Sequence, residues 1–105
     1  MPGYHVIDAQ RALELLSAQA VRVLDMRDAR SYRAGHLPGA AILHDGLEQQ
    51  LVDSAPRDAP VLVYCYRGVK SRDKAEYLAR LGFEQVYMLQ DGFSAWPRDA
   101  METLR

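Results

Sequence analysis

A continuous apolar run, VLVY at 61–64, narrows the possible folds of this chain more than any other feature. Runs of this kind form strands buried on both faces, and such strands occur in parallel sheets covered by helices. Other β-like runs at 4–7, 21–26, 40–43 and 85–89 alternate with segments of helical apolar periodicity. The alternation predicts an α/β fold with a mainly parallel central sheet and helices on both faces.

The helical segments carry recognisable boundary residues. Asp8 is predicted to cap a helix over 9–19, and Asp28 a short helix over 29–34 that Gly35 ends. Another helix is predicted over 46–53. After the cysteine segment, Ser71 is predicted to cap a helix that ends at Gly82. A last short helix is expected at 92–96, broken by Pro97.

Size and charge restrict the kind of protein. With 105 residues and 49% hydrophobic content, residues 1–105 are expected to form one domain with one core. A net charge of −1 gives no indication of nucleic acid or an anionic membrane as a partner. No apolar run approaches the ~18 residues of a membrane span, and the N-terminus has no signal-peptide core. We therefore expect a cytoplasmic protein.

The chain has a single cysteine, Cys65, directly after the apolar run. An internal disulfide and a CxxC redox or zinc motif are therefore impossible. The three histidines lack metal-ligand spacing. The absence of asparagine rules out a Cys-His-Asn triad and leaves a Cys-His-Asp triad open. Cys65 must act alone, or with nearby charges, backbone groups and an external partner.

Cys65 has two interpretations: a small buried hydrophobe that closes a strand, or a nucleophile. Four cations and one acid follow it within nine residues, a local charge of +3: Arg67, Lys70, Arg72, Lys74 and Asp73. Cations and a helix N-terminus both lower the pKa of a thiol, and Gly68 permits a tight loop. These features favour a nucleophile. The DMRD segment at 25–28 ends the neighbouring predicted strand, so both segments are expected at one sheet edge.

Three motifs resemble the rhodanese family. The segment 61–96, VLVYCYRGVKSRDKAEYLARLGFEQVYMLQDGFSAW, is similar to its active-site half. The segment 23–40 resembles its D-x-R signature followed by G-H-[IL]-P-G-A, and GF-x-x-W is also typical. The resemblance implies a three-layer α/β fold and a thiosulfate sulfurtransferase that works through a Cys65 persulfide. It also implies an acceptor such as cyanide or a thioredoxin-like protein dithiol, and no metal or organic cofactor.

The resemblance also assigns the site. The loop of Tyr66, Arg67, Gly68, Val69, Lys70 and Ser71 is expected to surround the persulfide with its N–H groups. Arg67 and Lys70 are expected to attract the dianionic donor, with Arg67 the more direct contact. Asp25 and Arg27 are expected to support the site, as an ion pair or cap. Val69 and Lys70 depart from many relatives, where small or polar residues are common.

Two alternatives stay open. One is a sulfur-carrier or regulatory module that uses the same loop to dock a partner protein. The other is a phosphatase or arsenate reductase of the same fold, whose Cys-x5-Arg pattern places a clamp arginine after the cysteine. Here Ser71 occupies that position and Arg72 comes one residue late, which at a helix start turns a side chain by ~100°. The sequence therefore favours sulfur chemistry over phosphoryl chemistry.

Overall fold

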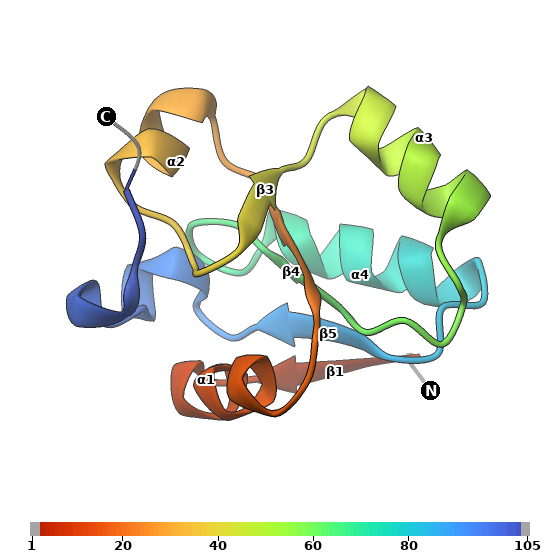
Figure 1. The fold of residues 1–105 in the computed structure, drawn as a ribbon, viewed down its shortest axis with the longest axis horizontal. Helices are drawn as coiled ribbons and strands as arrows, with labels where there is room; N and C mark the ends of the chain where they lie inside the picture. The colour runs from red at the N-terminus through yellow and green to blue at the C-terminus, as the bar shows by residue number, and fades with distance from the viewer. Residues whose placement is uncertain (1–2, 104–105) are drawn as a thin grey trace.

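The computed structural model describes residues 3–103 and contains five strands in one sheet, in the order β1-β5-β4-β2-β3. The strands are β1 (Tyr4–Ile7), β2 (Arg22–Asp25), β3 (Ala40–Ile42), β4 (Val61–Tyr64) and β5 (Val86–Leu89). The helices are α1 (Ala9–Ala18), α2 (Ala29–Ala34), α3 (Asp45–Ser54) and α4 (Lys70–Arg80), followed by the 3-10 turns η1 (Gly92–Ala95) and η2 (Arg98–Ala100). All four strand pairs are parallel, as the sequence predicted (Figure 1).

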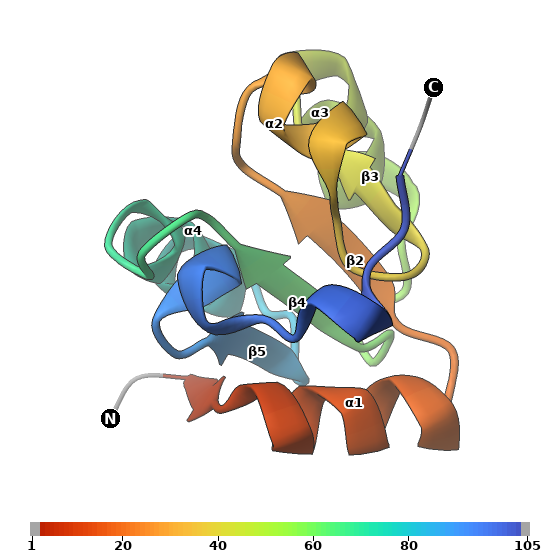
Figure 2. The ribbon, with the colours of Figure 1, turned by 90° about the vertical axis from the view of Figure 1, so that its left-hand side faces the viewer.

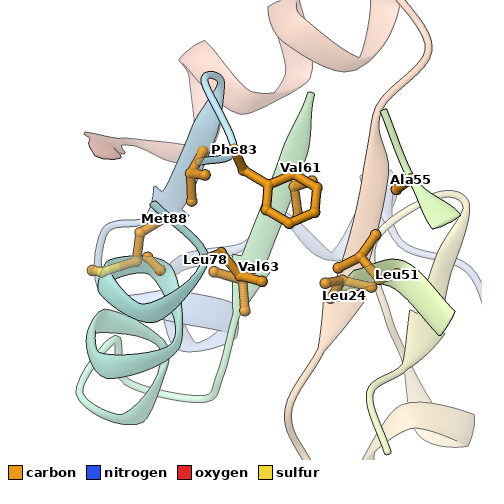
Figure 3. Close-up of a cluster of buried hydrophobic side chains, with 10 residues drawn as sticks. Leu24, Leu51, Ala55, Val61, Val63, Leu78, Phe83 and Met88 are labelled. Atoms are coloured by element: carbon orange, nitrogen blue, oxygen red, sulfur yellow. The ribbon is translucent and has the colours of Figure 1, made fainter. Parts of the chain in front are cut away.

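Side chains of the central strand alternate between the two faces of the sheet. Val61 and Val63 pack with α3 and α4, in a cluster that includes Leu51 and Leu78 (Figure 3). Leu62 and Tyr64 pack on the opposite face, with Ala12 of α1 and Trp96. All four residues of β4 are buried, which explains its continuous apolar sequence. The result is the expected arrangement of a sheet between two helical layers.

The strand order brings the two chemistry-bearing segments together. β2 and β4 are neighbours, and Asp25 at the end of β2 lies opposite Tyr64 at the end of β4. The segments that follow, one leading to Arg27 and one beginning with Cys65, therefore leave the sheet side by side at its carboxyl edge. This edge is where ligands bind in open parallel sheets.

Two of the predicted helix caps are confirmed. Asp8 accepts a hydrogen bond from Arg11 N at 2.8 Å, and Asp28 accepts one from Ser31 N at 2.8 Å. Gly35 ends α2 as predicted, but with extended backbone (φ 171°) and not in the left-handed form. A Cβ at Gly35 would lie 2.5 Å from Met101 Sδ, so close packing against the C-terminal segment explains the glycine.

The predicted cap at Ser71 is wrong. α4 begins at Lys70, and Val69, the residue before it, makes no side-chain capping hydrogen bond. Ser71 lies inside the first turn and is fully buried. Its backbone N–H donates to the Cys65 sulfur at 3.4 Å. The sulfur takes the place of a capping oxygen, which satisfies an N–H that a helix start leaves without a partner.

Within residues 3–103, no helix has the length and apolar character that crossing a membrane requires.

Candidate active site

Cys65 follows β4 directly, and its side chain is 6% exposed. Its Sγ accepts hydrogen bonds from Gly68 N at 3.1 Å and Ser71 N at 3.4 Å. The Ser71 hydroxyl lies 3.3 Å from Sγ. It accepts from a thiol and can turn to donate to a thiolate. The sulfur is therefore buried among donors that suit its negatively charged form.

These contacts change the pKa of Cys65. Burial raises it, but hydrogen bonds from the Ser71 hydroxyl and from the N–H groups of Ser71, Gly68 and Lys70 outweigh burial, so the pKa lies below the ordinary value. The sequence predicts that both the cations of the loop and the helix N-terminus lower this pKa. In the structure the leading causes are hydrogen bonds, and Lys74 is held in an ion pair with Glu48 of α3.

The sulfur opens into a cleft of about 530 Å³, which we call the Cys65 cleft. One wall is the segment after β2 and the other is the cysteine loop; its lining residues are Met26, Arg27, Asp28, Ser31, Cys65, Tyr66, Arg67, Val69 and Lys70. Tyr66 and Val69 are 52% and 69% exposed at its rim. Of the six predicted loop residues, four line the cleft and two, Gly68 and Ser71, bond Sγ. A separate hollow of about 430 Å³ between α3 and strands β2 and β3 contains none of them.

Two glycines allow the loop to close around the sulfur. Gly68 has a φ of +86°, and a Cβ there would lie 3.2 Å from Asp91 N. Gly92 has a φ of +58°, and a Cβ there would overlap the carbonyl oxygen of Cys65. The turn that Gly92 begins holds the loop from behind: Phe93 N donates to Cys65 O and Ser94 N to Tyr66 O, both at 2.9 Å.

Sequence reasoning missed the part played by Asp91 and Gly92. It treated DGFSAW only as the start of a helix that packs on the sheet. The available signal was the Asp91-Gly92 pair one residue after an apolar strand, a pattern typical of a turn with positive φ. Asp91 does adopt the left-handed conformation, with φ 60°.

Asp25 and Arg27 form a buried ion pair next to the cleft. Asp25 is fully buried, accepts from Tyr64 Oη at 2.5 Å, and pairs with Arg27 Nη2 at 2.7 Å. Arg27 Nη2 also donates to Gly35 O at 2.6 Å. Burial lowers the pKa of Arg27, but the hydrogen bond and charge of Asp25 outweigh this and raise it. Burial, followed by the Asp25 hydrogen bond, raises the pKa of Tyr64. Among the described residues, Asp25 makes no hydrogen bond to the cysteine loop.

Other candidate groups lie outside this cleft. His36 is buried, its Nδ1 lies 2.7 Å from Tyr32 O, and its ring stacks on Tyr32. Arg72 is exposed and does not line the cleft. Residues 3–103 contain no group of three or more His, Cys, Asp or Glu side chains that could hold a metal ion.

A thiol whose pKa is lowered, at the carboxyl edge of a parallel sheet and held by the amides of a strand-to-helix loop, defines a cysteine-dependent α/β protein of the sulfur- or phosphoryl-transfer type. Comparison with known protein families helps to distinguish sulfur transfer from phosphoryl transfer. Residues 8–99 match the model of the Rhodanese-like domain, and the chain belongs to this family.

Similar proteins agree with this assignment. The chain is 34% identical over 96 residues to thiosulfate sulfurtransferase GlpE of Shewanella oneidensis, covering 91% of this chain and 95% of the relative. It is 40% identical over 92 residues to the protein of the same name from Pseudoalteromonas translucida, covering 88% and 87%. The crystal structure of a rhodanese-like domain protein from Staphylococcus aureus superposes with a TM-score of 0.78 at 22% identity, covering 96% of this chain and 99% of the other, which supports the fold.

Proposed function

We propose that this protein is a sulfurtransferase that takes sulfane sulfur from thiosulfate and passes it to a thiophilic acceptor through a Cys65 persulfide. The observation that carries the proposal is the pair of backbone N–H groups and the hydroxyl that converge on Sγ and lower its pKa. The names of the similar GlpE proteins support thiosulfate as the donor.

The chemistry proceeds in two displacements. The Cys65 thiolate attacks the outer sulfur of thiosulfate, the sulfur–sulfur bond of the donor breaks, and its electron pair leaves with sulfite. The persulfide anion remains in the loop, where the N–H groups stabilise its charge. An acceptor, such as cyanide or a thioredoxin-like protein dithiol, then attacks the outer sulfur, and Sγ leaves as the thiolate. With no second cysteine in the chain, the acceptor must come from outside.

The two alternatives make different demands on the site. A sulfur-carrier module would form the same persulfide without sustained turnover, so turnover number separates it from the enzyme. A phosphatase or arsenate reductase needs a clamp arginine at the position that Ser71 occupies. The Ser71 hydroxyl points at Sγ from that position, and the late Arg72 is exposed. This arrangement supports sulfur transfer.

Intact-mass spectrometry tests the proposal. After incubation with thiosulfate, we expect the protein to gain the mass of one sulfur atom, and cyanide to remove it. Thiocyanate should then accumulate in molar excess over protein under steady-state conditions. Protein alkylated beforehand at Cys65 is the control and should gain nothing. An unchanged mass in the untreated protein would rule out the persulfide, and a single release of sulfur without turnover would identify a carrier.

Arg67→Ala is expected to raise the KM for thiosulfate roughly tenfold, because the variant loses a charge-assisted hydrogen bond from the guanidinium to the dianionic donor. Such a bond contributes about 1.5–3 kcal/mol to binding when it is desolvated, and less at an exposed site. With an uncharged organic persulfide as donor, the same variant should lose less than about threefold. Arg72→Ala is the matched control, since Arg72 is in the same segment but does not line the Cys65 cleft. Steady-state kinetics with both donors provides the measurement. Equal losses with the two donors would contradict a role for the charge of Arg67.

A further inference from the structure

A second hollow adjoins the Cys65 cleft. It measures about 330 Å³, and we call it the Trp96 hollow; its lining residues are Arg27, Ser31, Ala34, Gly35, Tyr66, Phe93, Ser94, Trp96, Arg98 and Met101. Arg27, Ser31 and Tyr66 line both spaces. Figure 2 shows the C-terminal turns η1 and η2 passing below α2, which is where this hollow lies. The Trp96 hollow therefore borders the space into which the Cys65 sulfur opens.

The walls of the hollow combine flat apolar surfaces with positive charge. Phe93, Trp96 and Met101 supply the apolar part. Arg98 supplies a positive charge, and Arg27 presents a guanidinium group whose charge is paired with Asp25 behind the wall. Aromatic walls beside polar groups that fix orientation also occur in pockets that hold small organic molecules.

One edge of the Arg27 guanidinium is not used by the contacts with Asp25 and Gly35. Its side chain is 8% exposed, and its Nε and Nη2 atoms bond Asp25 and Gly35 O. Its Nη1 has no hydrogen-bond partner among residues 3–103. The guanidinium also lies 4.0 Å from the centre of the Phe93 ring, which fixes its plane. The Nη1 N–H groups of this immobilised guanidinium can donate to an anionic oxygen.

Thiosulfate does not explain this second space. It is small and hydrophilic, has no apolar body to place against Phe93 and Trp96, and Arg67 and Lys70 already offer it charge in the Cys65 cleft. The other half of the reaction does require a second molecule. We propose that the Trp96 hollow binds the acceptor, and that the acceptor is a small thiol with a flat apolar body and one anionic group. This inference rests on the proposed function.

The transfer is balanced without a further reactant. The acceptor thiolate forms a bond to the outer sulfur of the Cys65 persulfide. The bond between that sulfur and Sγ breaks, and its electron pair returns to Sγ as the thiolate. The acceptor leaves as a persulfide, and no net oxidation or reduction of the system occurs.

Binding can be measured without turnover, because Trp96 is the only tryptophan of the chain and lines the hollow. Phenylacetate and phenylacetamide have the same shape and differ in charge. We expect phenylacetate to change the tryptophan fluorescence and to bind at least roughly tenfold more tightly than the amide. In Arg98→Gln this ratio should fall below about threefold. Arg33 lies in the last turn of α2, next to the lining residue Ala34, but does not line the hollow itself. Arg33→Gln should therefore keep the wild-type ratio.

Turnover with two thiols tests the acceptor assignment. With thiosulfate as donor, 4-mercaptophenylacetate should have a lower KM than its amide, and Arg98→Gln should remove the difference while Arg33→Gln preserves it. Equal KM values for the two thiols in the wild type, or equal binding of the two fluorescence ligands, would overturn the acceptor assignment. The proposed function would still hold in that case, provided that the protein transfers sulfur to cyanide. Tight, charge-selective binding in a protein that forms no persulfide would instead refute the proposed function, and with it the acceptor assignment.

Discussion

Replacing Cys65 with serine is expected to reduce sulfur transfer from thiosulfate to cyanide at least roughly a thousandfold, to background. A serine hydroxyl stays protonated near neutral pH and cannot form a persulfide that an acceptor would cleave. The Gly68 and Ser71 N–H groups, which lower the pKa of the thiol, have no comparable anion to stabilise in the variant. Steady-state production of thiocyanate and the intact mass after thiosulfate treatment measure the effect.

The fold should survive this substitution. Serine is slightly smaller than cysteine, and its Oγ can accept from the same two N–H groups. We therefore expect the circular dichroism spectrum to be retained and the melting temperature to change by only a few degrees. Turnover that persisted in a folded Cys65→Ser protein would eliminate the persulfide mechanism. Loss of structure would be detected by the same spectra, and the alkylated wild-type protein would then supply the evidence on the thiol.

Gly92→Ala is expected to destabilise the protein by about 2–5 kcal/mol, the combined cost of a left-handed backbone at a residue with a Cβ and of overpacking. At Gly92 that Cβ would overlap Cys65 O and lie 2.6 Å from Tyr66 O. Relief of the overlap requires the turn to move away from the cysteine loop. The movement weakens the hydrogen bonds from Phe93 N and Ser94 N that hold the loop. Activity should therefore fall further than the loss of folded protein explains.

Gly39→Ala is the matched control for this prediction. Gly39 also has a positive φ, +77°, but within residues 3–103 no heavy atom beyond its chain neighbours lies within 4 Å of the position of its Cβ. Gly39→Ala should lower the free energy of unfolding by only about 1 kcal/mol. Its activity per folded molecule should stay unchanged. Thermal denaturation and turnover normalised to folded protein compare the two variants. If Gly92→Ala were no worse than Gly39→Ala in both measurements, η1 would have no special part in shaping the active-site loop.

The sequence predicted the fold closely because its signals are local. The continuous apolar run of β4, the caps Asp8 and Asp28, and the alternation of strands and helices each follow from burial or hydrogen bonding within a few residues. The predictions were wrong where a side chain interacts with a residue that is distant in the sequence and not with its neighbours. Ser71 was assigned to a cap by its residue type, but Sγ of Cys65 satisfies the helix start and Ser71 faces inward. Lys74 was counted with the loop cations, although Glu48 of α3 holds it.

By itself the sequence determined the α/β class and singled out Cys65 and its loop as the candidate site, since hydrophobic periodicity and a unique cysteine can be found without any knowledge of distant contacts. Only the tertiary structure decided how the thiol is activated. Strand order placed Asp25 beside Tyr64, and the turn at Gly92, far along the chain, closes against Cys65 and Tyr66. The direction of an N–H group and the closeness of two backbones depend on packing between remote segments, and no local pattern of residues encodes them.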